Sequence, residues 1–159
     1  LDTYRAFVAG YSRVWTMDKA RAWFRRMEKA GIEPDDMNSY KDVIVAAIFV
    51  GQLEAADEWY AKMESAGISP DYGLFRSIID ALAQNGRADQ AKEWLGKMTL
   101  SSQRPSAQVY NSVILACARA GQAAEAETWL SEMASARVSP DAETYNTLIF
   151  GQSHAVEDG

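Results

Sequence analysis

Few residues in this sequence are of a type and spacing suited to catalysis or metal binding. Among its 159 residues there is one histidine, His154, and one cysteine, Cys117. These two residues provide neither the ligand spacing of a zinc site nor the set of groups that a catalytic triad needs. Carboxylates are numerous, but a glutamate on a helix surface has no apolar pocket to make it a general acid. No glycine-rich phosphate loop is present. The sequence therefore predicts no catalysis, no metal site and no cofactor.

Composition and charge narrow the class of protein further. Hydrophobic residues make up 48% of the chain, which argues against disorder. No apolar run approaches the roughly 20 residues that span a membrane, so no membrane insertion is expected. Cys117 lies in an apolar helical run and is interpreted as a small buried residue. Because the chain begins at Leu1, we expect it to be an excised or processed piece of a protein.

A recurring pattern of about 35 residues organises the whole chain. Its clearest copy places Ala126, Trp129, Leu130 and Met133 ahead of Pro140 and an aspartate. Four prolines close the four copies at spacings of 36, 35 and 35 residues: Pro34, Pro70, Pro105 and Pro140. A fixed period of this size is typical of a solenoid, in which each small unit packs mainly on its neighbours.

Each copy contains two helical patterns. The first helix opens around an aromatic residue, and in the fourth copy Tyr110, Val113, Ile114 and Cys117 follow at i, i+3, i+4 and i+7, which is one helix face. A glycine near its end allows a tight turn. The second helix carries alanine, tryptophan, a bulky apolar residue and methionine at the same spacing, so the tryptophans are expected in the core. The predicted units are residues 1–35, 36–71, 72–106 and 107–141, with 142–159 as the first helix of a truncated fifth unit or a cap.

The sequence resembles the pentatricopeptide repeat family. The run Tyr145-Asn-Thr-Leu-Ile149, the Ala120-Gly121 pair and the endings at 27–35 and 63–71 match the pattern of that family. The competing tetratricopeptide repeat has a period of 34 residues and a different opening. The resemblance covers essentially the whole chain. It implies an all-α, right-handed solenoid of two-helix repeats, whose first helices line a concave groove.

In this family the groove typically binds single-stranded RNA, about one base per repeat. The main contacts come from the residue after the helix-opening aromatic and the residue after the closing proline. Carried over to this chain, the pairs are Arg5 with Asp35, Lys41 with Asp71, Arg76 with Ser106, and Asn111 with Asp141; Asn146 begins a fifth pair. Arg13 and Arg119 match a place where the family often has a phosphate-contacting cation.

The expected contacts are mostly with the RNA backbone. Only the Asn111/Asp141 pair resembles a standard base-reading pair, of the type associated with uridine. The other pairs place a cation where a reading side chain usually stands, and a cation holds a phosphate better than it distinguishes a base edge. The position that usually sandwiches the base carries Asp2, Asn38, Gly73, Gln108 and Glu143 instead of an aliphatic residue. The base sandwich is therefore doubtful throughout.

Charge, sorted by helix, favours the same site. The first helices up to Arg119 sum to +3, whereas the net charge of the chain is -6. A cationic groove on an acidic body suits RNA binding in an organelle, mitochondrion or plastid, where the resemblance implies a role in RNA processing, stability or translation. Four units contact about four nucleotides, so a longer array or a partner is implied.

A protein scaffold is the alternative function. Arg5 could form a surface ion pair with Asp35, and Lys41 with Asp71, each contributing about 0–1 kcal/mol. The chain would then be a protein–protein scaffold or a structural subunit of a larger organellar complex. Free side chains at positions 5, 41, 76 and 111 would favour RNA; buried or ion-paired ones would favour the scaffold. An incomplete last unit would expose an apolar face, so end-to-end self-association is possible.

Overall fold

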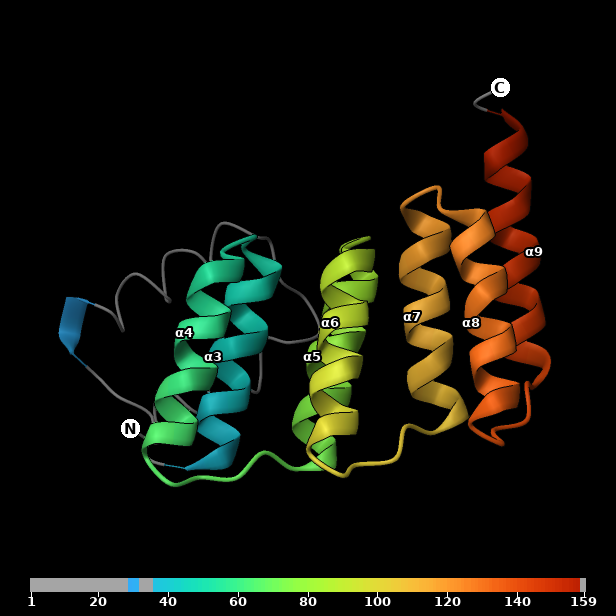
Figure 1. The fold of residues 1–159 in the computed structure, drawn as a ribbon. Helices are drawn as coiled ribbons and strands as arrows, with labels where there is room; N and C mark the ends of the chain where they lie inside the picture. The colour runs from blue at the N-terminus through green and yellow to red at the C-terminus, as the bar shows by residue number, and fades with distance from the viewer. Residues whose placement is uncertain (1–28, 32–35, 158–159) are drawn as a thin grey trace. The chain divides into compact units, whose positions relative to one another are not determined.

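The computed structural model describes residues 29–31 and 36–157, and the secondary structure of this part is entirely helical (Figure 1). Six helices have 13 residues each: α3 (Met37–Phe49), α4 (Leu53–Ser65), α5 (Tyr72–Gln84), α6 (Ala88–Leu100), α7 (Ala107–Arg119) and α8 (Ala123–Ser135). The last helix, α9 (Ala142–Glu157), has 16 residues. The predicted all-α repeat fold is confirmed. Most of the first predicted unit lies outside the described residues.

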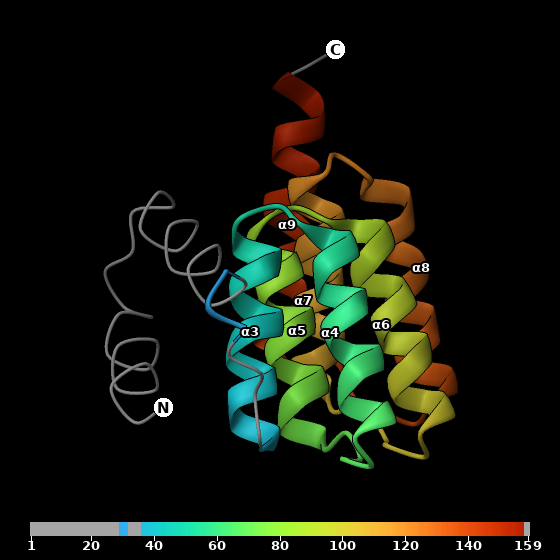
Figure 2. The ribbon, with the colours of Figure 1, turned by 90° about the vertical axis from the view of Figure 1, so that its left-hand side faces the viewer.

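The chain divides into two compact units, Leu1–Pro70 and Asp71–Gly159. In the first unit, the described helices α3 and α4 pack against each other. In the second unit, the first helices α5, α7 and α9 lie side by side, and the second helices α6 and α8 pack on them (Figure 2). The described helices fall within the boundaries expected for the repeats, and the exact division into repeats stays a prediction.

The first helices begin at a side chain that caps their free N–H groups. Asp36, Asp71 and Asp141 stand four residues before the helix-opening aromatic, and each accepts a hydrogen bond from a backbone N–H three residues later, at 2.7–2.9 Å. An acidic N-cap also favours the positive end of the helix dipole. Ser106 stands at the same position before α7 but makes no such capping bond. The closing Pro-Asp motif is therefore also the start signal of the next helix.

The core of each repeat forms between the aromatic of its first helix and the tryptophan of its second. The ring centroids of Tyr40 and Trp59 lie 6.4 Å apart, and those of Phe75 and Trp94 lie 6.3 Å apart. Tilted aromatic pairs at this distance stabilise beyond their buried area. Trp59 and Trp94 are buried as predicted, whereas Trp129 is half-buried. Trp129 lies at the end of the stack, where no further second helix follows α8 among the described residues.

Two turns after second helices adopt a backbone conformation that favours glycine. Ser102 and Arg137 have φ angles of 60° and 57°, in the left-handed region, whereas Gly31 and Gly67 occupy the equivalent turns upstream. A side chain in this region costs about 1–2 kcal/mol. Packing of the helices on either side holds these turns in place despite that cost.

Helix α9 occupies most of the predicted final segment, from Ala142 to Glu157. Its packing on α7 requires a glycine, because a Cβ at Gly151 would lie 2.8 Å from the Cβ of Ala118. The two helices therefore approach more closely at this point than any side chain on α9 would allow.

Candidate nucleic-acid interface

The Asn111/Asp141 pair is brought together by the start of α9. Asn111 Nδ2 donates a hydrogen bond of 3.1 Å to Asp141 Oδ1, and the Thr144 hydroxyl donates one of 2.6 Å to Asn111 Oδ1. Asn111 is 3% exposed and Thr144 is fully buried. The amide is thus held in one orientation by Asp141, which precedes α9, and by Thr144 in the first turn of α9. Nδ2 carries two N–H donors, and one of them is used by Asp141.

Hydrogen bonding holds the pKa of Asp141 below its usual range. The backbone N–H of Thr144 is the largest cause, and the Asn111 amide and the Thr144 hydroxyl follow. Donors to a carboxylate favour its charged form. Asp141 is therefore ionised at neutral pH, and its charge fixes the Asn111 amide with its nitrogen toward the carboxylate.

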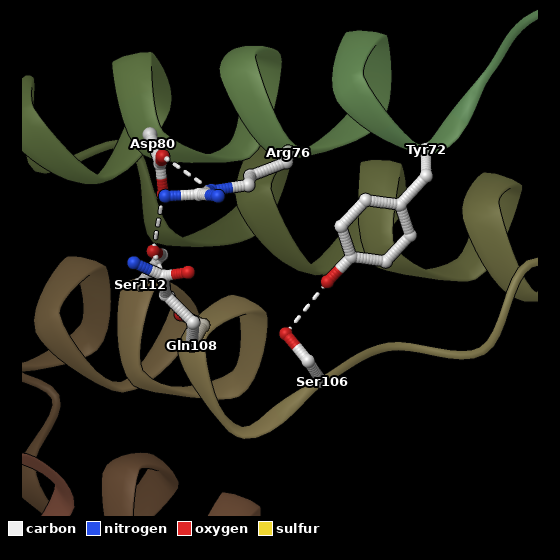
Figure 3. A network of polar contacts seen from close by, with 6 residues as sticks. All are labelled: Tyr72, Arg76, Asp80, Ser106, Gln108 and Ser112. Atoms are coloured by element: carbon white, nitrogen blue, oxygen red, sulfur yellow. Dashed lines mark hydrogen bonds and ion pairs between the residues drawn. The ribbon is translucent and has the colours of Figure 1, made fainter.

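Arg76 and Ser106 do not contact each other. Figure 3 shows that Arg76 turns toward Asp80, one turn further along α5, with Nε 3.6 Å from Asp80 Oδ2. Ser106 instead shares a hydrogen bond of 2.6 Å with the phenol of Tyr72. The expected pair therefore splits into two separate contacts. A third residue, Ser112 of α7, donates a hydrogen bond to Asp80 and so links α7 to α5.

We call the side of α5 and α7 that carries these residues the first-helix face; it comprises Tyr72, Arg76, Asp80, Gln108 and Ser112 (Figure 3). Elsewhere on α5, Phe75, Ile78 and Ile79 are fully buried. The Arg76 side chain keeps 43% of its surface exposed despite its ion pair. An exposed ion pair of this kind contributes little, so the guanidinium can change partner at low cost.

The remaining expected contacts have separate surroundings. Lys41 lies in the first unit and donates a hydrogen bond of 3.3 Å to Asn38, whereas Asp71 lies in the second unit and caps α5. Arg119 donates a hydrogen bond of 2.7 Å to the carbonyl of Gln84, at the end of α5. Asn146 is exposed on α9. Arg5, Arg13 and Asp35 lie outside the described residues.

The helix cap before α3 is Asp36, the residue after the predicted Asp35. Asp36 occupies the capping position that Asp71 and Asp141 occupy before α5 and α9. The signal was present in the sequence, because the first proline spacing is 36 residues while Tyr40 and Phe75 are 35 apart. Counting back from the aromatic, rather than forward from the proline, identifies Asp36. Thr144 was missed for another reason: its role depends on a contact between repeats.

The described first helices carry little net charge. Helices α3 and α5 are each neutral, α7 carries one net positive charge, and α9 carries two net negative charges. The rest of the predicted positive charge belongs to Arg5 and Arg13, which lie outside the described residues. The second helices α4 and α8 each carry three net negative charges, and α6 is neutral.

Cys117 is fully buried, and burial raises the pKa of its thiol, which disfavours the reactive thiolate. In the described residues, no three histidine, cysteine or acidic side chains cluster closely enough to hold a metal ion. None of the described helices combines the length and apolar character needed to cross a membrane.

Three models of known repeat families match the chain. The model described as "Pentatricopeptide repeat domain" matches residues 23–85 and 61–117, "PPR repeat family" matches 105–153, and "PPR repeat" matches 2–32. No curated protein sequence matches the chain.

Solved structures of repeat proteins share the fold. The pentatricopeptide repeat protein PPR10, in complex with an 18-nucleotide psaJ RNA element, is 25% identical, with a TM-score of 0.72 over 97% of this chain and 23% of that one. The maize PPR10 structure is 21% identical, with a TM-score of 0.65 over 98% of this chain and 23% of that one. The chain therefore spans about a quarter of the length of PPR10.

A structure of lower sequence identity, most of whose chain is covered, also shares the fold. The PPR domain of Arabidopsis thaliana protein-only RNase P 1, in complex with tRNA, is 12% identical, with a TM-score of 0.66 over 99% of this chain and 82% of that one. At this identity the likeness concerns the fold alone. Family models for the repeat cover more than half of the chain, and its helices form the corresponding repeat architecture. The chain belongs to the pentatricopeptide repeat family.

Proposed function

We propose that this chain binds single-stranded RNA along its first helices as a non-catalytic module. The observation that carries the proposal is the fixed Asn111–Asp141 pair, in which the two expected side chains contact each other. The Asn111 amide keeps one N–H donor beyond the one given to Asp141, and such a donor suits a carbonyl acceptor on a base, as uracil has. The similarity to PPR10, whose solved complex contains RNA, supports the same function.

Most of the affinity in this proposal comes from the phosphate backbone. Lys41, Arg76 and Arg119 are the cations of the described first helices, and each makes a contact that a phosphate can replace. Binding through phosphates is salt-dependent, with a slope of about -0.7 per contact for a single strand. We therefore expect weak base selectivity, restricted to the repeat that contains Asn111.

Two charge-matched variants test this proposal. The first replaces Lys41, Arg76 and Arg119 by Gln; the second replaces Lys29, Lys62 and Lys97, which lie outside the first helices, by Gln. Both remove three positive charges, so a general electrostatic effect changes both equally. Binding of a randomised single-stranded RNA pool is measured at low and moderate salt, after circular dichroism has confirmed equal helicity.

The expected result is a loss of affinity and a shallower salt dependence in the first variant only. Equal losses in the two variants would show that RNA is attracted to the chain as a whole and not to the first helices. No binding by the wild-type chain at low salt would refute the RNA-binding function. Sequencing of the bound pool, with and without Asn111→Ala, then tests whether a preference for uridine depends on that amide.

The cellular role follows from the family in this proposal. We propose that the full protein acts in a mitochondrion or plastid on the processing, stability or translation of a transcript. The short array contacts about four nucleotides, so further repeats or a partner would supply the remaining specificity. Imaging of the full-length protein with an organelle marker tests the location, and a cytosolic signal would contradict it.

We further propose a protein contact at the end of the stack, as the second candidate function. Tyr145 and Ile149 of α9 are 52% and 64% exposed, whereas the equivalent Tyr110 and Ile114 are buried, and Phe150 adds to the exposed apolar surface. The burial of Asn111 and the ion pair of Arg76 also favour a scaffold over an RNA-reading module. An exposed apolar patch of this kind typically marks an interaction site.

Self-association through this face is tested by mass measurement across a range of concentrations. We expect the wild type to form dimers and Ile149→Glu to remain monomeric, because a charge on the apolar face opposes its burial. Lys62→Glu, a change on a second helix, serves as a control and should leave the dimer intact. A wild-type chain that remains monomeric at high concentration would contradict self-association.

A further inference from the structure

The first residue of α5 differs from its equivalents in the other described repeats. Tyr72 occupies this place, whereas α3, α7 and α9 begin with Met37, Ala107 and Ala142. The next residue, Gly73, stands where the family usually has an aliphatic side chain that sandwiches a base. The third repeat therefore has no side chain at the usual sandwich position and a large aromatic one beside it.

The Tyr72 ring is held in a defined place and remains accessible. Its hydroxyl shares a hydrogen bond of 2.6 Å with Ser106 Oγ, so the ring spans from α5 to the segment that precedes α7 (Figure 3). Ser106 belongs to the expected base-contacting set, and Arg76 lies one turn along α5 from Tyr72. The residue is half-exposed, and none of the described aromatic rings stacks on it.

The core aromatic residue of α5, Phe75, differs from Tyr72 in its burial. Phe75 is fully buried and packs on Trp94. Tyr72 is only half-buried, and its hydroxyl end is held by Ser106. Arg76 lies one turn along the same helix, and proteins stack nucleobases without sequence preference on aromatic side chains that lie along a positively charged groove.

We propose that Tyr72 is a stacking platform for a nucleobase at the third repeat, replacing the side chain that Gly73 lacks. Arg76 lies beside it and holds the adjacent phosphate after it leaves Asp80. The hydroxyl of Tyr72 orients the ring through Ser106 and does not itself select a base. This inference rests on the proposed RNA-binding function. It adds a contact that tolerates every base, because each base has a stacking face.

The test compares three substitutions of Tyr72 with labelled homopolymeric oligonucleotides of uridine, cytidine and adenosine. Tyr72→Ala and Tyr72→Leu remove the aromatic face, and we expect each to weaken binding of all three oligonucleotides by roughly 5- to 150-fold. Tyr72→Phe removes the hydrogen bond to Ser106 but keeps the ring, and we expect its affinity to stay within a few-fold of the wild type. Tyr145→Ala, at another exposed tyrosine, is the matched control and should have no effect on RNA affinity.

Two further readouts separate stacking from a structural effect. Tyr72→Ala removes no charge, so the slope of affinity against salt should not change even though affinity falls. Oligonucleotides that contain 2-aminopurine should lose fluorescence on binding the wild type, and part of that quenching should disappear with Tyr72→Ala but persist with Tyr72→Phe.

The outcomes distinguish this inference from the proposed function. If the wild type binds RNA while Tyr72→Ala or Tyr72→Leu binds equally well, the stacking platform is refuted and the RNA-binding function remains. Unchanged quenching in Tyr72→Ala would also refute it. If the wild type binds none of the oligonucleotides at low salt, the RNA-binding function itself fails.

Discussion

Helices α7 and α9 open with the same two residue types, yet those residues have opposite surroundings. In α7, Tyr110 packs on Trp129 and Asn111 is buried between α7 and the start of α9. In α9, the equivalent Tyr145 and Asn146 are exposed. The difference lies in the neighbours, because α7 has a following second helix and a following repeat. A repeat in this family thus becomes complete only when the next one packs on it.

The same comparison explains why one expected pair forms and another does not. Asn111 meets Asp141 because Thr144 holds the second side of the amide. Arg76 has no such partner and turns to Asp80 in its own helix, while Ser106 turns to Tyr72. Residues at equivalent sequence positions therefore contact each other only where both segments supply compatible groups.

The largest expected effect contrasts Ile114 with Ile149. Ile114→Ala should destabilise the protein by about 2–5 kcal/mol, because the side chain is fully buried and its removal leaves a cavity. Ile149→Ala should change stability by less than about 0.5 kcal/mol, since that side chain is mostly exposed. Urea unfolding followed by circular dichroism measures both. Equal losses would show that a partner covers the α9 face in solution.

A smaller effect is expected from the hydroxyl that links the two repeats. Thr144→Val keeps the shape of the side chain but leaves Asn111 Oδ1 buried without its donor, which costs about 1–3 kcal/mol. Thr147→Val is the control, because that hydroxyl bonds only to the carbonyl of Glu143 within its own helix. Thermal unfolding of the two variants should differ clearly. A Thr147→Val loss as large as that of Thr144→Val would contradict the buried bridge.

The close approach of α7 and α9 predicts a net loss from Gly151→Ala. A new methyl group would lie 2.8 Å from the Cβ of Ala118, and overpacking of this kind costs about 1–3 kcal/mol. The better helix propensity of alanine offsets about 0.5–1 kcal/mol of that loss. Gly96→Ala, where a Cβ meets nothing within 4 Å, should be stabilising and serves as the control. Stabilisation by both substitutions would show that α9 can shift on α7.

The contribution of the Asp141 carboxylate to stability should decrease in acid. The pKa of Asp141 is depressed in the folded chain, so its contribution is present above the ordinary aspartate value of 3.8 and is lost as the pH falls through the lower folded pKa. Asp141→Asn lacks this charge at every pH. The stability difference between the wild type and Asp141→Asn should be greatest near neutral pH and shrink below 3.8. A difference that is constant with pH would contradict the charged pair.

Local signals in the sequence determined the repeat, the helices and most of the core. Aromatic and tryptophan spacing predicted which faces are buried, because a helix places residues three and four apart on one side. The proline that closes each repeat marked the end of a second helix, because proline cannot continue a helix. The expected pair of Asn111 with Asp141 followed from the resemblance to the family.

Only the tertiary structure decided which side chains meet. Arg76 pairs with Asp80, Ser106 with Tyr72, and Asn111 with both Asp141 and Thr144, and each choice depends on distances between atoms that sequence spacing does not specify. Tyr145 and Ile149 carry the same pattern as their buried counterparts and remain exposed. Hydrophobic periodicity records which face of a helix favours burial, whereas burial itself requires a neighbouring surface to exclude the water.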